Sequence, residues 1–442
     1  MVPTSRTVVL VDAYSTGQYF IPRLHALGFR IIHVVTPSAR SDHMSSYISV
    51  VRNKYASLFA DWLEWDDNPD KTLQQIRSYQ PCAVIAGAES GVELADDLAE
   101  KLGVPGNGTE LSNARRDKFL MQQALRDKGV PTMEFYLADN LDRLLVWTGR
   151  LGRWPVIIKP IRGAGTYGVH TCHTQEAVIA AWKMLTGEAG LFGEENTAVL
   201  AEECLTGIEY VVNTVSYNGK HSLSEFWVYR KIPVPGIAPI YDYCRLLPYP
   251  EAGDPLHGLI EYAFKAIDAL GITHGPAHSE VMLTAQGPRL IESGARVMGG
   301  SLDPDIVTDC IGHNQVDWTI DCHLFPEKFI HKSAAPYAVR NFLMMKFLIA
   351  QRAGHIRDIP FLQLASKLPS AYVGDLVHVI ETENLEKTID LFTAPGMIIL
   401  KHPDEKVLLA DYQTIADLET RYQDRLYELD GDLPRPPYGD MI

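Results

Sequence analysis

The chain has 442 residues, of which 46% are hydrophobic and 21% are charged. This composition is ordinary for a globular protein, and the length is too great for one hydrophobic core, so several subdomains are expected. The formal net charge of −15 argues against a nucleic-acid-binding surface, which needs a basic stripe, but it does not exclude a locally basic ATP site.

The cysteines and the apolar segments indicate the compartment. Six cysteines show no Cys-x-x-Cys pair and no zinc-ligand spacing. In a chain of this size they are expected to be reduced thiols of a cytosolic protein. No apolar stretch approaches the length of a signal or membrane segment. We therefore predict a soluble, cytoplasmic protein with neither a membrane nor a nucleic acid as a partner.

Strand and helix patterns alternate at the start of the chain. Strands are predicted at 7–11, 30–35 and 82–86, and helices at 17–27, 69–79 and 93–102. Alternating units of this kind imply a parallel sheet covered on both faces, with its functional edge at the carboxyl ends of the strands. At the last junction Ser90 precedes Glu93 in a capping-box pattern, which favours a structural role for Ser90 over contact with a substrate.

The rest of the chain divides at changes in pattern. A turn cluster at 104–108 marks the first boundary, and an amphipathic helix is predicted at 113–128. A small α/β unit follows, then a region of longer strands with one clear helix at 256–270. Strand and helix signals continue at 370–381, 385–391 and 396–402. We predict four regions, bounded as 1–110, 111–204, 205–330 and 331–442.

A glycine-rich segment follows a short apolar strand that ends at Lys159. The segment contains Gly163, Gly165, Thr166 and Gly168. The same glycine spacing is the dinucleotide fingerprint, but that motif requires a helix directly after the glycines. Here 169–172 is β-branched and predicts a strand, and a helix begins only near Thr174. We expect a hairpin whose backbone N–H groups and neighbouring lysine bind a phosphate chain, the alternative being a plain hairpin.

An apolar strand at 199–203 ends in two acids, Glu202 and Glu203. Backbone groups at a strand end can bind an adenine edge, and a carboxylate a few residues later can accept hydrogen bonds from ribose. A solvated strand end is an equal alternative for these acids. Lys118, on the predicted helix at 113–128, is by itself more typical of a solvated lysine.

Two apolar strands, at 276–283 and 288–296, are joined by a turn at 286–287, and each carries a glutamate. Adjacent antiparallel strands can bring Glu280 and Glu292 together on one face. Paired carboxylates repel each other unless a cation or proton separates them. Mg²⁺ typically binds one or two carboxylates together with phosphate oxygens. A magnesium site is therefore predicted, the alternative being two edge glutamates paired with arginines.

Three further features surround this pair. His278 lies one β-period from Glu280 and should face the same side, either as a core histidine or as a residue that orients a substrate. Arg296 follows the second strand. Gly299 and Gly300 then form a loop that allows close approach of a ligand.

The order of these features resembles the ATP-grasp superfamily. The segments 275–280 and 291–300 look like the L-amino-acid ligases, dipeptide synthases of the bacilysin-ligase type. The resemblance covers residues 1 to about 330 and implies an ATP-grasp fold of the α/β class, α+β in the C-terminal parts. Its expected parts are an N-terminal Rossmann-like parallel-sheet domain, a small lid subdomain, a central antiparallel-sheet domain and a C-terminal cap.

The resemblance also implies a role for each matching residue. For ATP, it implies Lys118 and Lys159 on the α- and β-phosphates, the loop 163–168 as a lid, Lys231 near the γ-phosphate, Glu202, Glu203 and Leu205 around adenine, and Glu209 on ribose. For Mg²⁺, or Mn²⁺, it implies Glu280 and Glu292. For the transferred phosphoryl group and the intermediate, it implies Arg296. Ser90, Gly299 and Gly300 are further candidate substrate contacts, and His278 is a catalytic candidate. One departure is Gly294, where many ATP-grasp enzymes carry a metal-binding asparagine.

The activity implied is ATP-dependent formation of an amide between two amino acids, or between an amino acid and a related acid, through an acyl phosphate. A homodimer is also expected from the resemblance. Two alternatives stay open. One is another ATP-grasp enzyme, such as a purine-pathway ligase or a biotin-dependent carboxylase subunit. The other is a regulatory module that binds ATP without turnover.

Overall fold

The computed structural model describes residues 6–66, 68–234, 238–251, 253–361, 365, 367–372, 384–421 and 427–431. The chain forms two compact units. The first comprises Met1–Tyr229, Pro235–Ala238 and Leu246–Arg340, and the second comprises Arg230–Val234, Pro239–Arg245 and Asn341–Ile442. Most of the range 370–381, where a strand or helix signal was predicted, lies outside the described residues. No helix in the described part of the chain is long and apolar enough to cross a membrane.

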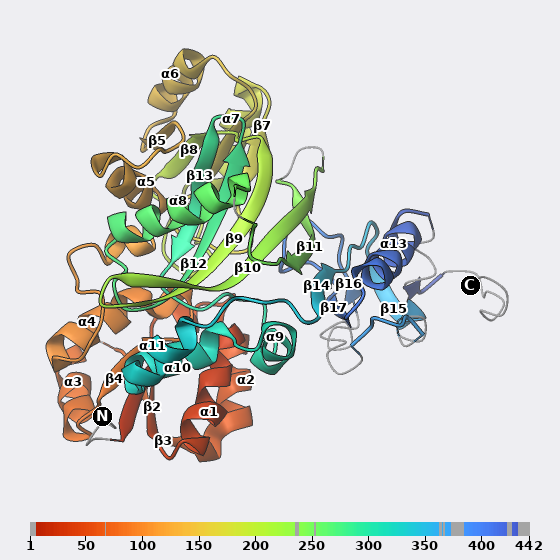
Figure 1. Ribbon diagram of the computed structural model, residues 1–442. Helices are drawn as coiled ribbons and strands as arrows, with labels where there is room; N and C mark the ends of the chain where they lie inside the picture. Colours follow the sequence, from red (N-terminus) through yellow and green to blue (C-terminus); the bar gives the residue numbers. More distant parts are fainter. Residues whose placement is uncertain are drawn as a thin grey trace. The chain divides into compact units, whose positions relative to one another are not determined.

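The first unit begins with a parallel sheet in the order β3-β2-β1-β4. Its strands are β1 (Thr7–Val11), β2 (Arg30–Val35), β3 (Phe59–Glu64) and β4 (Ala83–Ala86), and its helices are α1 (Phe20–Ala26), α2 (Ser45–Tyr55), α3 (Pro69–Ser78) and α4 (Val92–Leu102) (Figure 1). The predicted parallel sheet is confirmed. β3 and α2 were not predicted, because the edge strand β3 is only partly buried and carries no continuous apolar run.

The capping-box prediction for Ser90 is wrong. Helix α4 starts after Gly91, whose position as N-cap involves no side-chain bond. The Ser90 hydroxyl instead donates to Asp12 Oδ2 at 2.6 Å and lies 2.9 Å from the Tyr14 hydroxyl. Ser90 therefore faces the carboxyl ends of β1 and β4, where a parallel sheet places its ligands.

A small antiparallel sheet carries the glycine-rich loop. Its order is β5-β8-β6-β7, formed by β5 (Phe135–Ala138), β6 (Val156–Pro160), β7 (His170–Cys172) and β8 (Val199–Glu203), with helices α6 (Leu141–Leu151) and α7 (Gln175–Leu185) packed on it (Figure 1). Thr174 caps α7 by accepting from Ala177 N at 3.2 Å. The predicted strand, loop and strand are confirmed, and the dinucleotide fingerprint is excluded.

The helix predicted at 113–128 is divided. A 3-10 turn, η5 (Asn113–Arg115), precedes α5 (Lys118–Asp127). The turn ends at Arg115, and Asp117 caps α5 by accepting from Leu120 N at 2.9 Å. Lys118 is thus the first residue of a helix and is buried, rather than solvated on a helix surface.

The central part of the first unit is an antiparallel sheet in the order β13-β12-β9-β10. Its strands are β9 (Gly207–Tyr217), β10 (Lys220–Ile232), β12 (Gly275–Thr284) and β13 (Gly287–Gly294), and α8 (Pro255–Ala269) packs on β12 and β13. Three further helices, α9 (Pro304–Ile311), α10 (Gln315–Leu324) and α11 (Pro326–Ser333), were not predicted. Helix α10 buries polar as well as apolar residues, so its sequence shows no one-sided apolar stripe.

The second unit has its own core. Strands β11 (Ile240–Leu246), β14 (Phe342–Phe347) and β17 (Met397–His402) pair side by side, and α13 (Glu405–Arg421) packs on β14 and β17. Short strands β15 (Gly354–Asp358), β16 (Asn384–Leu385) and β18 (Glu428–Leu429) form a second small sheet. Of the ranges with a predicted strand or helix signal, 396–402 contains strand β17, whereas 385–391 contributes only its first residue, to β16.

Candidate active site

Two glutamates face each other across neighbouring strands. The antiparallel pairing of β12 with β13 places Glu280 directly opposite Glu292, and His278 opposite Gly294. Opposite residues of an antiparallel pair project from the same face, so the two carboxylates share one surface of the central sheet. A bulge after Glu280 locally shifts the register at this point, as is common beside functional sites.

Lys118 joins this pair to the glycine-rich loop. Its Nζ lies 3.0 Å from Glu292 Oε2 and donates to the carbonyl oxygen of Gly163 at 2.8 Å. Burial alone would raise the pKa of Glu292, but the charges of Lys118 and Arg296 outweigh it and leave the pKa lowered. Glu292 is therefore ionised and is held beside a lysine at the loop.

Lys159 forms a second buried ion pair. Its Nζ lies 2.7 Å from Glu202 Oε2, and both side chains are almost fully buried. The other oxygen of Glu202, Oε1, is buried and has no hydrogen-bond partner among the residues that the structure describes. A buried acceptor without a donor is costly, and the exocyclic amine of adenine is a donor of the kind that would satisfy it.

The glycine-rich loop has left-handed backbone at several positions. The φ angles of Gly165, Thr166 and Gly168 are 62°, 65° and 68°. A Cβ atom at Gly168 would also lie 2.9 Å from Pro160 Cγ. Glycine is therefore required at 168 both by backbone conformation and by space. Thr166 adopts the same conformation without being glycine, and its hydroxyl donates to the carbonyl oxygen of Gly165 at 2.6 Å.

His278 is fixed by a buried polar chain. Asn213 Nδ2 donates to Glu225 at 2.9 Å, so Asn213 Oδ1 accepts from His278 Nδ1 at 2.8 Å. His278 Nε2 then lies 3.4 Å from Glu280 Oε1. Burial, with a contribution from Arg296, lowers the pKa of His278 far below its ordinary value. His278 is thus neutral and oriented toward Glu280.

The remaining predicted nucleotide residues are placed in different ways. Glu209 pairs with Met282 across β9 and β12, on the face that also carries Glu280. The Glu203 carboxylate instead binds Arg153 at 2.9 Å and Glu134 N at 3.1 Å. Successive strand residues point to opposite faces, so the structure does not bring the Glu203 side chain to Lys159.

Leu205 and Lys231 are less closely tied to the site. Leu205 follows β8 and is partly buried. Lys231 belongs to the second unit, where its Nζ lies 4.5 Å from the ring centroid of Tyr241. The roles predicted for these two residues stay predictions.

The predicted substrate loop contacts the N-terminal sheet. Gly300 N donates to the Ser15 hydroxyl at 3.1 Å, and Ser15 begins the 3-10 helix η1 (Ser15–Tyr19) that follows β1. Arg296 Nε lies 3.1 Å from Glu89 Oε2. The strand-end turns of the parallel sheet therefore border the face that carries Glu280 and Glu292.

Sequence reasoning missed a chain of charged residues at this border. Arg162 binds Glu93 through two bonds of 2.7 and 2.9 Å. Arg116 Nη1 lies 3.4 Å from Glu93, and its Nε lies 4.0 Å from Glu89. The available signal was the position of Glu89, just after β4, because open α/β sheets bind ligands at the carboxyl ends of their strands.

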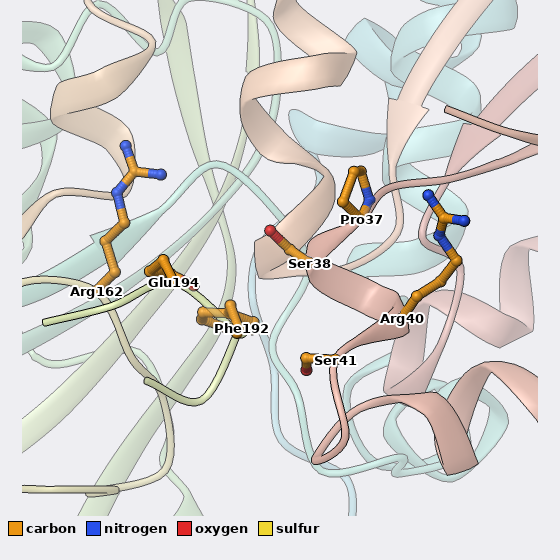
Figure 2. Close-up of a pocket in the computed structure, with 8 residues that line it drawn as sticks. Pro37, Ser38, Arg40, Ser41, Arg162, Phe192 and Glu194 are labelled. Atoms are coloured by element: carbon orange, nitrogen blue, oxygen red, sulfur yellow. The ribbon is translucent and has the colours of Figure 1, made fainter. Parts of the chain in front are cut away.

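A cavity of about 540 Å³ lies next to Arg162. Figure 2 shows Arg162, Phe192 and Glu194 on one side of it and the turn after β2, which carries Arg40, on the other. Its remaining lining residues are Pro37, Ser38, Ser41 and Gly193. None of the predicted site residues lines this cavity, whereas Lys118, Glu280 and Glu292 lie together at the central sheet.

The donor set suits a hard cation that also binds phosphate. Among the described residues, no three His, Cys, Asp or Glu side chains are grouped so as to hold a metal ion by themselves. Two carboxylates, Glu280 and Glu292, are nevertheless what Mg²⁺ uses when nucleotide phosphates and water complete its shell. Gly294 contributes no side chain, so the asparagine ligand of many ATP-grasp enzymes is absent from this position. The residues present fit magnesium bound together with ATP.

Comparison with known proteins identifies the family. A model of the ATP-grasp domain matches residues 152–305. Dapdiamide A synthase from Enterobacter agglomerans is 32% identical over 422 residues, which cover 94% of this chain and 96% of that protein. The chain belongs to the ATP-grasp L-amino-acid ligase family. The L-arginine-specific L-amino acid ligase of Bacillus subtilis is 25% identical over 271 residues, covering 58% of this chain and 63% of that ligase.

The fold of this ATP-grasp ligase agrees with a solved relative. The crystal structure of an L-amino acid ligase from Bacillus licheniformis superimposes with a TM-score of 0.71 at 18% identity, covering 93% of this chain and 97% of that one. At this identity the likeness supports the fold alone. The family and the fold expected from the sequence are confirmed, and the roles of single residues stay proposals.

Proposed function

We propose that this protein is an ATP-dependent carboxylate–amine ligase that joins two amino acids, or an amino acid and a related acid, and releases ADP and phosphate. The observation that carries the proposal is the placement of Glu280 opposite Glu292, with Lys118 bonded both to Glu292 and to Gly163 of the glycine-rich loop. A phosphate chain lying under that loop would meet a lysine and two carboxylates at once.

ATP is assigned to the surface between the loop and the central sheet. Lys118 and Lys159 would contact the α- and β-phosphates as point charges, and the loop 163–168 would close over them. The unpartnered oxygen of Glu202 would accept from adenine, and Glu209 would bind ribose. When an ATP phosphate approaches, Lys118 can exchange its bond with Glu292 for one with the phosphate.

Glu280 and Glu292 would hold Mg²⁺, with Mn²⁺ as a substitute. The bound ion would neutralise charge on the phosphate oxygens. The ionised state of Glu292 prepares it for this role, because the neighbouring cations already keep its pKa low.

The reaction then needs two displacements. An oxygen of the substrate carboxylate attacks the γ-phosphorus, the bond to the ADP oxygen breaks, and an acyl phosphate forms. The amine of the second substrate attacks the acyl carbon, the bond to the phosphate oxygen breaks, and the amine loses a proton as the amide forms. Arg296 would stabilise the transferred phosphoryl group, and the closed loop would keep water from the acyl phosphate.

His278 and the loop that contains Gly299 and Gly300 would orient the substrates. The neutral Nε2 of His278 faces Glu280 and can accept a hydrogen bond from an amine or a carboxylic acid. Gly299 and Gly300 offer backbone at close range, and Ser90 stands at the strand ends nearby. These are the proposed substrate contacts, and a homodimer is the proposed assembly.

The test is phosphate release from ATP with pooled amino acids, followed by the mass of the product. Release that requires two amino acids and yields their condensation product supports the proposal. Release that instead requires bicarbonate would indicate a carboxylase. Tight ATP binding without any release would indicate a regulatory module, and either result would overturn the ligase assignment.

A further inference from the structure

Glu89 occupies space that a side chain at position 294 would need. A Cβ atom built on Gly294 would lie 2.6 Å from Glu89 Oε2 and 3.4 Å from Arg296 Nε. The φ angle of Gly294 is not in the left-handed region, so its backbone does not require glycine. The close neighbour is the Glu89 carboxylate, the end of a flexible side chain, so a side chain at position 294 would have to displace that carboxylate.

The turn that carries Glu89 is locked by close packing. A Cβ atom at Gly87 would lie 2.4 Å from Ala13 Cα, and one at Gly91 would lie 2.7 Å from the carbonyl oxygen of Val11. Between these glycines, Ser90 donates to Asp12. Backbone on both sides of Glu89 is therefore pressed against the end of β1, and this contact fixes the point from which the Glu89 side chain extends.

The Glu89 carboxylate holds Arg296 at a defined orientation. Arg296 Nε donates to Glu89 Oε2 at 3.1 Å, while Arg296 Nη1 donates to the carbonyl oxygen of Val297 at 3.1 Å. Two bonds from different nitrogens fix the plane of a guanidinium group, and the bond to a carboxylate is the stronger of the two. Arg116, on the far side, lies 4.0 Å from Glu89 Oε1 and draws the carboxylate with a second positive charge.

We propose that Glu89 is a positioning residue of the ligase reaction: its carboxylate fills the space left open at Gly294 and holds Arg296 toward the transferred phosphoryl group. The inference rests on the proposed function and deepens it, since it explains how a residue of the N-terminal sheet controls a residue of the central sheet. Glu89 acts through Arg296 and is assigned no contact with the reacting atoms.

The experiment is a double-mutant cycle of Glu89→Ala and Gly294→Ala, read as kcat and as KM for ATP in the phosphate-release assay. Each single variant should lower kcat by about 10–100-fold, because each removes the carboxylate from Arg296. KM for ATP should stay within about twofold, since neither variant touches the proposed nucleotide contacts. The double variant should be no worse than Glu89→Ala alone, because the added methyl group then has nothing to displace.

Two variants sharpen the cycle. Glu89→Gln keeps an oxygen acceptor for Arg296 and should retain more activity than Glu89→Ala. Glu93→Ala is the matched control. Glu93 binds Arg162 and Arg116 and is not among the nearest atoms that a Cβ atom at Gly294 would meet. Any fall in kcat caused by Glu93→Ala should therefore multiply with the fall caused by Gly294→Ala. If Glu89→Ala does not fold, Glu89→Asp replaces it, since a carboxylate one methylene shorter clears the same space.

The outcomes separate this inference from the proposed function. Losses that multiply in the Glu89 cycle, or a raised KM for ATP with unchanged kcat, would overturn the positioning role while leaving the ligase assignment intact. If no pair of amino acids supports phosphate release, the proposed function fails. A crystal structure of Gly294→Ala then still decides the inference: a Glu89 carboxylate displaced from Arg296 supports it, and an undisturbed pair refutes it.

Discussion

Each unit of the molecule buries a lysine beside a glutamate, but the two lysines differ in how many partners they have. In the second unit, Lys346 Nζ lies 2.6 Å from Glu419 Oε2, 2.7 Å from the carbonyl oxygen of Phe347 and 3.0 Å from Asp242 Oδ1. Both oxygens of Glu419 accept hydrogen bonds, Oε2 from Lys346 and Oε1 from Ile349 N at 2.9 Å. In the first unit, Lys159 binds Glu202, and the second oxygen of Glu202 is buried with no hydrogen-bond partner in the described part of the chain.

From this comparison we infer that the Lys346 pair is structural and that the Lys159 pair is prepared for a ligand. A buried ion pair whose polar atoms all have hydrogen-bond partners makes the core more rigid. A buried pair with an unbonded polar atom lowers stability unless a ligand supplies the missing bond. Burial alone does not separate the two cases, because both lysines are almost fully buried. The two glutamates do differ, because both oxygens of Glu419 are bonded, whereas Oε1 of Glu202 has no partner among the described residues.

The largest effect is expected from Glu292→Gln, which removes one charge from the facing pair at nearly constant volume. We expect kcat to fall by about 10³-fold, since a carboxylate that holds the metal and orders Lys118 is lost. The measurement is phosphate release with the best amino-acid pair. Glu261→Gln, at an exposed position of α8, is the matched control and should behave like the parent. An active Glu292→Gln would remove the metal assignment.

Exchanging the two lysines for methionine tests the comparison itself. Lys346→Met should lower the free energy of unfolding by about 3–5 kcal/mol, because Glu419 and Asp242 lose their shared cation. Lys159→Met should instead raise KM for ATP and lower kcat, each by about tenfold.

Thermal unfolding with and without ATP separates the two lysine variants further. ATP should raise the melting temperature of Lys346→Met as it does that of the parent, and this shift should be largely lost in Lys159→Met. If ATP failed to raise the melting temperature of either variant, the two buried ion pairs would not differ in function.

A smaller effect is expected from Gly165→Val in the glycine-rich loop. A β-branched residue at a φ of 62° costs about 1–2 kcal/mol and should hinder closure of the loop. Water would then reach the acyl phosphate, so the ratio of phosphate released to amide formed should rise above one. Gly219→Val is the control, because Gly219 has a similar φ of 75° and open surroundings. A rise with both variants, or with neither, would count against the loop as the lid.

The smallest expected effect is a change in the pH dependence of stability, and it comes from His33, which is fully buried in the first unit. Burial lowers the pKa of His33 to about 3 from an ordinary value of 6.5. The unfolded chain therefore binds the proton more readily, and the stability that neutral His33 provides above pH 6.5 is lost as the pH falls toward 3. Between pH 6 and 5, the loss is about 1.4 kcal/mol per pH unit. The free energy of unfolding, measured with denaturant, should depend less on pH between 6 and 5 in His33→Gln than in the parent. Equal pH dependence in the two proteins would contradict this prediction.

The sequence predicted the fold best where burial is one-sided or complete. β1 and β2 are almost completely buried and consist mainly of Val, Ile and Leu, and their limits agree with the structure. Helix α10 was not predicted from the sequence, because it buries polar residues such as Gln315 and Asp321. That Glu280 and Glu292 lie on one face could be predicted from the alternation of side chains along two strands that are adjacent in the sequence.

Other parts of the site depend on contacts between distant segments. The bond between Lys118 and Glu292, and that between Glu89 and Arg296, join residues far apart in the chain, and no spacing rule predicts them. The Glu203 side chain was assigned to adenine with Glu202, although strand alternation sends the two in opposite directions. Gly294 was noted only for a missing asparagine, because the group that fills its space comes from another sheet.

The transfer of an oxygen atom tests the proposed mechanism most directly. The attacking carboxylate oxygen becomes the bridge of the acyl phosphate, and it leaves with phosphate when the amine attacks. With amino acids labelled by ¹⁸O in their carboxylates, mass spectrometry should therefore find one ¹⁸O atom in each phosphate released. Phosphate that carries no label, from an enzyme that still forms the amide, would contradict the acyl-phosphate route.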